Sequence, residues 1–145
     1  MTDLPTINFI GNKQKISSWI SSHFGANIDS IFDAFSGGCS ISYKAKKMGL
    51  RVLSNDILKM NFHIAKGIIE NSSTLLQAAD VKKIFSGEPV EGFIYKNFSN
   101  VYYFPDECMQ LDNYRKNIDL ISNEYKKSLA LILLRRAMIR KRPYS

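Results

Sequence analysis

The sequence of 145 residues has little cysteine, and this scarcity argues against two common classes of small protein. Cys39 and Cys108 form no CxxC pair, and no histidine-rich tract accompanies them. Disulfide-held secreted domains and structural zinc sites both need more cysteine or histidine at close spacing. We therefore expect neither a disulfide framework nor a metal site, and we interpret His23 and His63 as ordinary side chains.

Long apolar runs are also missing from the sequence. No stretch of eighteen apolar residues occurs, and no apolar segment follows a basic start at the N-terminus. A membrane-spanning helix requires the first pattern, and a secretory signal requires the second. We accordingly expect a cytoplasmic protein that does not enter a membrane.

Negative charge is in short supply as well. Lysine and arginine number 20 against 13 aspartate and glutamate residues, which gives a formal net charge of +7. Because an excess of positive charge attracts polyanions, this balance favours a nucleic acid over a neutral partner. The hydrophobic content of 45% is otherwise that of one globular domain able to bury a core.

The most informative pattern predicts two strands with a helix between them. Apolar runs over residues 28–35 and 50–54 are typical of strands, and residues 40–48 are typical of a helix that ends at Gly49. A connection of this length cannot form a hairpin, so the two strands are expected to pair in parallel. This order favours an α/β fold.

Two features at the ends of these strands indicate a nucleoside site. Gly37 and Gly38 follow the first strand, and Asp56 follows the second about 20 residues later. A glycine turn allows close approach of a ligand to the backbone, and a carboxylate at the next strand end can accept hydrogen bonds from ribose hydroxyls. The G-x-G-x-x-G pattern of diphosphate-bearing cofactors is missing, which ranks NAD low and favours S-adenosylmethionine.

Outside this unit the pattern is mainly helical. Helices are expected over residues 12–20, 57–70, 74–85 and 129–140, with another that opens at Pro105. We divide the chain into residues 1–72, a cofactor-binding β-α-β portion, and residues 73–145, a helical and aromatic extension leading into a target-recognition region. Residues 90–104 are rich in aromatic side chains, for which packing in the core of a strand is favoured over base stacking. The residues concerned are Phe93, Tyr95, Phe98, Tyr102, Tyr103 and Phe104.

Several segments, in order, resemble the Dam-like N6-adenine-specific DNA methyltransferases. They are residues 8–13 (NFIGNK), 33–38 (DAFSGG), 54–57 (SNDI), 103–107 (YFPDE) and 111–115 (LDNYR). The resemblance covers nearly the whole chain. It implies a Rossmann-like S-adenosylmethionine-dependent methyltransferase fold, present incompletely and with a helical extension. It also implies methylation of adenine in double-stranded DNA, within a restriction-modification setting.

The resemblance assigns roles to five residues of this sequence. It implies that Phe9 packs on the cofactor and that Lys13 contacts its polar end. Phe35 and Gly37 would shape the methionine side of the pocket, and Asp56 would bind the ribose. An ammonium group can neutralise a cofactor carboxylate, and an aromatic face suits a sulfonium cation or an adenine ring.

The sequence departs from the family pattern in two places. Cys39 stands where the family carries a second glycine, so the turn must accept a side chain there. The catalytic motif [D/N]-P-P-[Y/F/W] is absent from the 145 residues. That motif accepts hydrogen bonds from the adenine amino group and stacks on the flipped base. We therefore assign no catalytic residue, interpret the chain as the N-terminal part of a methyltransferase, and expect no methyl transfer by this chain alone.

Other interpretations remain open. The chain could be half of a split enzyme, whose partner chain supplies the motif and further strands and docks on an exposed sheet edge. It could instead be a non-catalytic module that binds nucleic acid through the basic end of the chain. The residues of that end are Arg135, Arg136, Arg140, Lys141 and Arg142. The same charges could equally serve to stabilise a helix C-terminus.

Overall fold

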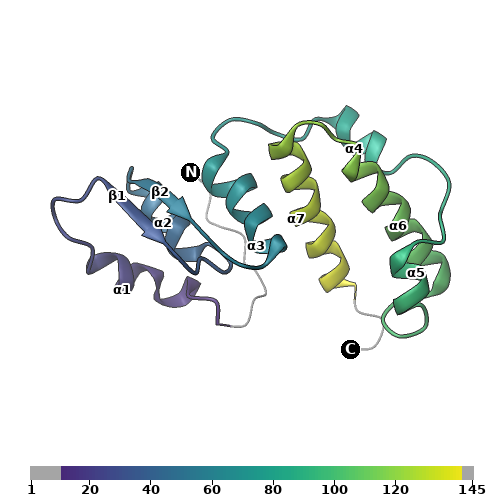
Figure 1. Ribbon diagram of the computed structural model, residues 1–145, viewed down its shortest axis with the longest axis horizontal. Coiled ribbons are helices and arrows are strands. Elements are labelled where there is room, and N and C mark those ends of the chain that lie inside the picture. Colours follow the sequence, from purple (N-terminus) through teal and green to yellow (C-terminus); the bar gives the residue numbers. More distant parts are fainter. Residues whose placement is uncertain (1–10, 142–145) are drawn as a thin grey trace. The chain divides into compact units, whose positions relative to one another are not determined.

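The structure, a computed structural model, describes residues 11–141. These residues divide into two compact units that meet between Ser73 and Thr74, and the elements of both are labelled in Figure 1. The roles that the sequence analysis assigns to the two parts of the chain stay predictions. Phe9 and Arg142 lie outside the described residues, so their assigned roles also stay predictions.

The first unit combines short helices with a pair of strands. Its elements are η1 (Gln14–Ile16), α1 (Ser17–Ser22), β1 (Ser30–Asp33), α2 (Ser40–Lys47), β2 (Arg51–Ser54), α3 (Lys59–Ile64) and η2 (Ala65–Glu70). The element η1 is a 3₁₀ helix and η2 is a π-helix. The helix expected over residues 57–70 is thus present, but it starts two residues later and widens into a π-helical second half.

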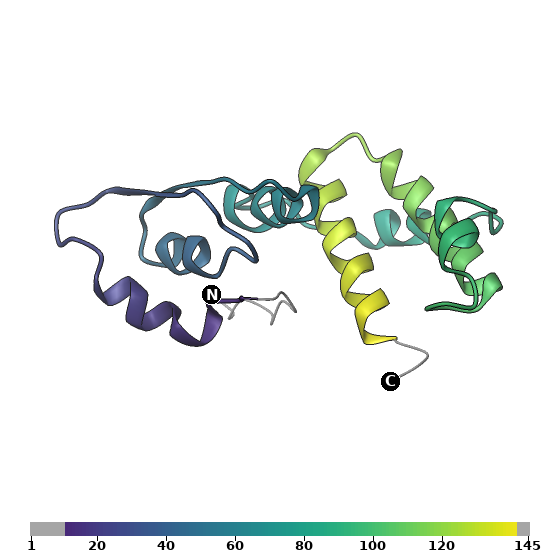
Figure 2. The same cartoon turned by 60° about the horizontal axis from the view of Figure 1, so that its bottom comes forward.

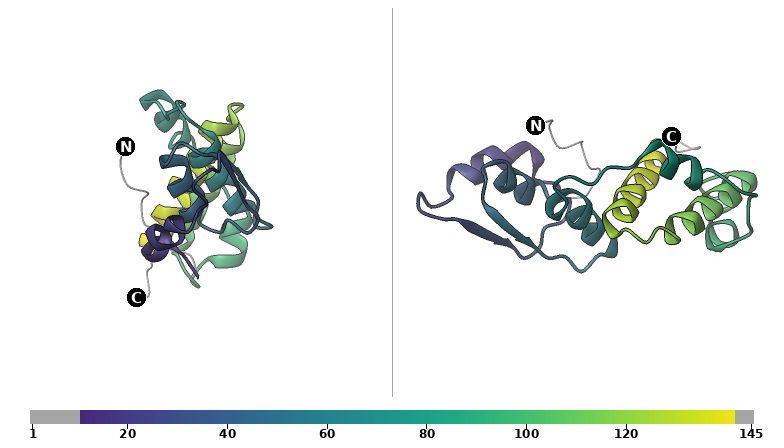
Figure 3. Two further views of the ribbon diagram at one scale, coloured as in Figure 1. Left: turned by 90° about the vertical axis from the view of Figure 1, so that its left-hand side faces the viewer. Right: turned by 90° about the horizontal axis from the view of Figure 1, so that it is seen from above.

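The strands β1 and β2 pair in parallel, with Ser30 opposite Arg51 and Asp33 opposite Ser54. Helix α2 connects them and packs against both, and α1 packs against α2. Figure 2 and the right-hand view of Figure 3 show α2 between the strands and α1. The predicted parallel strand–helix–strand unit is therefore confirmed, and this small sheet is compatible with part of a methyltransferase fold.

A chain of polar contacts joins the carboxyl ends of the two strands to α2. The hydroxyl of Ser42, fully buried, donates to Asp33 Oδ2 at 2.5 Å and accepts from Ser54 Oγ at 2.9 Å. Asp33 ends β1 and Ser54 ends β2. Because buried polar groups are costly unless they are paired, this network fixes where each strand ends.

Lys46 of α2 caps the C-terminal end of the π-helix η2. Lys46 Nζ donates to the carbonyl of Ile68 at 2.8 Å and to that of Asn71 at 2.6 Å, and its burial lowers the pKa of its ammonium group. Carbonyl groups at a helix C-terminus have no partner within the helix and carry partial negative charge. The contact holds the end of η2 against the helix that follows the glycine turn.

The second unit is helical. Its elements are α4 (Ala78–Ile84), α5 (Phe93–Phe98), α6 (Pro105–Asp119) and α7 (Glu124–Arg140). Helix α6 contacts α4, α5 and α7. The expectation of an aromatic strand near residue 95 is wrong, because residues 93–98 form α5 and the side chains of Phe93, Tyr102 and Phe104 are all more than half exposed.

The carboxylate of Asp112 fixes the start of α5. It is buried, lies on α6, and accepts from the backbone N–H groups of Gly92 at 3.1 Å, Ile94 at 2.9 Å and Tyr95 at 2.8 Å. These are the N–H groups that a helix start leaves without partners, and a negative charge there is favourable. A residue about 20 positions away thus caps a six-residue helix that has little stability of its own.

Candidate functional site

The glycine turn and the acidic strand end lie in direct contact. The backbone N–H of Gly37 donates to Asp56 Oδ2 at 2.8 Å. The turn is also tied to the second strand end, since Ser36 N donates to Asn55 O at 2.9 Å and Asn55 Nδ2 donates to Ala34 O at 3.0 Å. The parallel register brings these two ends to the same edge of the sheet, so the structure joins Gly37 and Asp56 as the sequence analysis expects.

Two further donors act on the Asp56 carboxylate. Oδ1 accepts from Leu58 N at 3.0 Å and from Asn61 Nδ2 at 3.0 Å. The Leu58 N–H, followed by the Asn61 amide and the Gly37 N–H, lowers the pKa of Asp56 below its ordinary value. Hydrogen bonds to the charged form favour that form, so Asp56 is an ionised acceptor at neutral pH.

Cys39 lies at the bottom of the turn in a left-handed backbone conformation. Its φ is 58°, a region that costs a residue with a side chain roughly 1–2 kcal/mol. Its thiol is fully buried, and burial raises its pKa to about 11. The buried hydroxyl of Ser36 lies beside this thiol and has no oxygen or nitrogen partner among residues 11–141. The turn therefore accommodates a side chain at its last position, but in a strained backbone conformation.

Exposed apolar side chains flank the contact between Gly37 and Asp56. Phe35 is 91% exposed and Ile57 is 96% exposed, and each is a near neighbour in sequence of one of the two contact residues. Large apolar groups at this exposure are uncommon when grouped together, and such groups mark binding surfaces. The edge of the sheet therefore combines a charged acceptor, backbone N–H groups and apolar faces.

The segment before α1 contacts the start of α2 through Asn12. Asn12 Oδ1 accepts from Ser40 Oγ at 2.6 Å and from Gln14 N at 2.9 Å, and Ser40 is the first residue of α2. Lys13 follows Asn12 and is exposed, and its ammonium group donates to Gly11 O at 3.1 Å. The structure thus places Lys13 next to a residue that contacts the helix following the turn.

The predicted basic residues lie at the end of α7. Arg135 and Arg136 are half-buried, and Arg140 is exposed. Lys141 forms an ion pair with Glu107, which raises the pKa of the lysine and lowers that of the glutamate. Part of the positive charge at this helix end is therefore offset within the unit.

The sequence analysis missed two side chains at the site. Asn61, on α3, binds the Asp56 carboxylate, and Asn12 binds the start of α2. Asn61 is 2% exposed, and a polar residue on the apolar stripe of an expected helix is the one signal that could have drawn attention to it.

Metal and membrane features are not found in the described part of the chain. Residues 11–141 contain no group of three or more histidine, cysteine, aspartate or glutamate side chains able to hold a metal ion. Among the same residues, no helix has both the length and the apolar character that a membrane span needs.

Comparisons with known proteins identify relatives of the whole region. Over 141 residues the chain is 50% identical to the Type II methyltransferase M2.HphI of Haemophilus parahaemolyticus, a match that covers 97% of this chain and 42% of that protein. It is 25% identical over 147 residues to the Type II methyltransferase M.CviAII of Paramecium bursaria Chlorella virus 1, covering 88% of this chain and 44% of that protein. The chain thus spans less than half the length of these relatives. No solved structure matches it.

The family match is equally extensive. Residues 9–141 match the family described as D12 class N6 adenine-specific DNA methyltransferase. This range includes all of the structure's helices and strands, as well as nearly all of the segments on which the resemblance was based. The resemblance inferred from the sequence is confirmed, and membership of such a family implies a methyl donor. The chain belongs to the D12 class N6 adenine-specific DNA methyltransferase family.

Proposed function

We propose that the first unit binds S-adenosylmethionine as the cofactor-binding part of a Rossmann-like methyltransferase that methylates adenine in DNA. The observation that supports it most is the 2.8 Å contact between Gly37 N and Asp56 Oδ2. It joins a glycine turn and a carboxylate at the carboxyl ends of adjacent parallel strands, which is where ligands bind in open α/β sheets.

The residues at this edge fit the chemical groups of S-adenosylmethionine. The Asp56 carboxylate can accept from a sugar hydroxyl, and its charge is held in place by three protein donors. Phe35 and Ile57 offer exposed apolar surface for an adenine ring or a sulfonium. Lys13 is close in sequence to a residue bound to α2, and its ammonium group can neutralise a carboxylate.

The bound donor supplies an electrophilic methyl group, and the chain's own residues hold and orient it. Asp56 would hold the sugar through its carboxylate, and the glycine turn would bind the donor through its backbone. The amino nitrogen of adenine is a weak nucleophile, and methyl transfer requires it to be aligned with the donor. Groups of the [D/N]-P-P-[Y/F/W] kind perform that alignment, and the 145 residues contain none.

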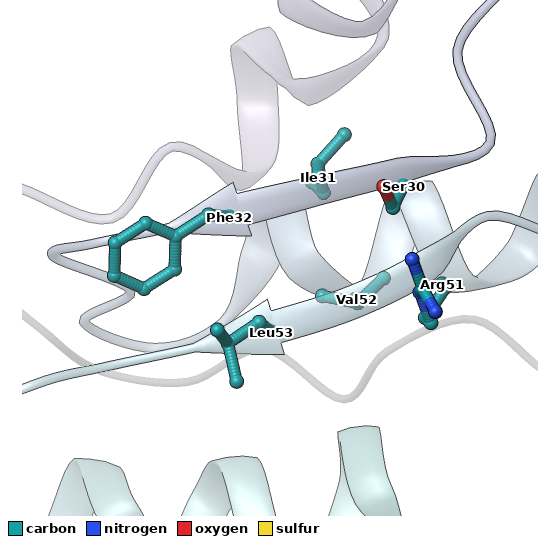
Figure 4. A pocket seen from close by; sticks show the side chains of 6 residues that line it. All are labelled: Ser30, Ile31, Phe32, Arg51, Val52 and Leu53. Atoms are coloured by element: carbon teal, nitrogen blue, oxygen red, sulfur yellow. The ribbon is translucent and has the colours of Figure 1, made fainter.

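We further propose that a polypeptide carrying this motif covers the outer face of the sheet. Phe32 and Leu53 lie opposite each other in the strand pair and are 62% and 65% exposed. Both residues line a pocket of about 440 Å³ formed by β1 and β2, and Figure 4 shows their side chains on the paired strands. Parallel strands are almost always covered on both faces, and α2 covers one. A polypeptide that carries the [D/N]-P-P-[Y/F/W] motif and further strands is the proposed occupant of the other face.

Titration calorimetry tests the donor site directly. S-adenosylmethionine and its demethylated product are expected to bind the purified chain, whereas NAD is not, because the turn lacks the third glycine that accommodates a diphosphate. Binding of NAD with no response to S-adenosylmethionine would contradict the proposal.

A methylation assay tests the requirement for the motif. The purified chain is expected to form no N6-methyladenine in duplex DNA. Addition of a separately prepared polypeptide that carries the [D/N]-P-P-[Y/F/W] motif is expected to restore methylation and to bury Phe32 and Leu53. Methylation by the purified chain alone would refute the requirement.

DNA binding through α7 is a second function that the exposed Arg140 favours. Each phosphate contact contributes about 0.9 to the slope of log K against log salt. We expect Arg140→Gln to reduce that slope by about one. Lys141→Gln should reduce it less, because Glu107 already offsets the charge of Lys141. Lys82→Gln, an exposed charge change on α4, is the matched control, and an equal effect of Lys82 and Arg140 would argue against a local contact.

A further inference from the structure

Asn61 is the most deeply buried polar side chain that touches the candidate site. It lies on α3, is 2% exposed, and donates from Nδ2 to Asp56 Oδ1 at 3.0 Å. A buried amide is kept where its hydrogen bonds are satisfied, and a bond to an ionised acceptor is stronger than one between neutral groups. The contact therefore ties the interior of α3 to the exposed strand end.

The hydrogen-bond donors that contact Asp56 do not occupy every acceptor position of its carboxylate. An ionised carboxylate has about four acceptor positions, two on each oxygen. Oδ1 accepts from Leu58 N and Asn61 Nδ2, which fills both of its positions. Among residues 11–141, Oδ2 accepts from Gly37 N alone. With respect to this part of the chain, one acceptor position remains, and it is on Oδ2.

We propose that Asn61 is a positioning residue that fixes the Asp56 carboxylate so that Oδ2 receives a single hydroxyl of the methyl donor's sugar. This inference rests on the proposed function of the site. In this arrangement Oδ1 is bound by protein donors, so the carboxylate accepts one ribose hydroxyl and not two. The second hydroxyl is then left to other groups or to water.

Without Asn61 the carboxylate would be free to turn. Leu58 N and Gly37 N would still bind one oxygen each, and the two oxygens could then exchange roles or tilt toward solvent. Among residues 11–141, the Cys39 thiol lies near Asp56 and is also subject to the charge of Asp33. That thiol is protonated at neutral pH and supplies no charge that could replace the amide of Asn61.

Two substitutions at Asn61 test the proposal with opposite pH responses. Asn61→Leu removes the donor at similar volume, and we expect about tenfold weaker binding of S-adenosylmethionine from pH 6 to 8. Asn61→Asp places a second carboxylate against Asp56, and we expect a larger loss at pH 8. Binding by this variant should recover as the pH falls and the pair takes up one proton, because the introduced carboxyl group would donate again once protonated. A purely structural role would not produce this recovery.

Asn55→Ala is the matched control. It removes a side-chain bond to the backbone in the same turn, that of Asn55 Nδ2 to Ala34 O, and leaves Asp56 untouched. Its affinity is expected to be pH-independent over the same range. Equal affinities and equal pH profiles for the wild type and both Asn61 variants would overturn the proposal.

A carboxyl NMR titration separates this inference from the proposed function, since it requires no donor. Asn61→Leu is expected to raise the pKa of Asp56 toward its ordinary value, and Asn61→Asp is expected to raise it further. If Asn61→Asp does not fold, Asn61→Leu alone is sufficient for this test. An unchanged Asp56 pKa in Asn61→Leu would overturn the positioning role. If the pKa shifts as expected but the wild type binds no S-adenosylmethionine, only the proposed function is overturned.

Discussion

Replacement of Asp56 by alanine is expected to weaken S-adenosylmethionine binding by at least a factor of about ten. A hydrogen bond to a charged group contributes about 1.5–3 kcal/mol, and loss of the sugar contact alone gives a change of this size. The structure adds a second effect, because Gly37 N, Leu58 N and the Asn61 amide lose their common acceptor. The buried Asn61 amide is the costliest of these to leave unpaired.

The substitution should therefore also lower the stability of the first unit, by about 1–2 kcal/mol. Calorimetry measures the affinity, and urea unfolding measures the stability. Asp29→Ala is the matched control, because Asp29 is exposed and accepts from the Ser30 hydroxyl rather than from the turn. An Asp56→Ala protein with wild-type affinity would remove Asp56 from the site.

The pH dependence of this stability has a definite sign. The pKa of Asp56 is lowered in the folded chain. Its contribution to stability is thus present above the unfolded value, about 3.9, and is lost as the pH falls through the lower folded value. The difference in stability between the wild type and Asp56→Ala should be constant from about pH 5 to 7 and should shrink only in stronger acid.

Gly92→Ala is expected to destabilise the second unit by about 3 kcal/mol. A Cβ at Gly92 would stand 2.6 Å from Cγ and Oδ1 of Asp112, closer than any real contact. Asp112 cannot retreat without giving up its bonds to Gly92 N, Ile94 N and Tyr95 N. Overpacking and loss of the cap on α5 therefore act together.

Thermal unfolding measures this effect, and a change of 1 kcal/mol corresponds to about 4–8 °C for a unit of this size. Gly25→Ala is the control for a glycine-to-alanine change elsewhere: its Cβ would meet Ile28 Cγ2 in the first unit at 3.4 Å, and the second unit should melt as in the wild type. If the second unit of Gly92→Ala melts with that of the wild type, the close approach of Gly92 to Asp112 does not govern the stability of this unit.

The local pattern of the sequence was sufficient for the parallel strands and for their meeting at Gly37 and Asp56. Alternating and helical periodicity fix which residues are apolar together, and a strand–helix–strand order has essentially one topology. The strand ends were less well defined, because the Asp33–Ser42–Ser54 network that fixes them joins residues far apart in sequence.

The second unit shows why other elements could not be predicted. Aromatic side chains favour strands by propensity, yet Phe93 and its neighbours form α5 because Asp112 supplies the helix start with an acceptor. Asp112 lies about 20 residues from the start of α5, so this interaction produces no periodic pattern in the local sequence. The contact of Asn61 with Asp56 was also missed: a polar residue on the apolar side of the helix was a signal, but the local sequence does not show which group a buried amide binds.

The buried thiol of Cys39 has a consequence for any electrophile held at the turn. Thiolates attack alkylating agents readily, whereas protonated thiols do so poorly. With a pKa of about 11, the Cys39 sulfur is overwhelmingly protonated at neutral pH. If the proposed methyl-donor site lies at this turn, the protonated thiol of Cys39 would not compete with the proposed nucleobase acceptor for the methyl group.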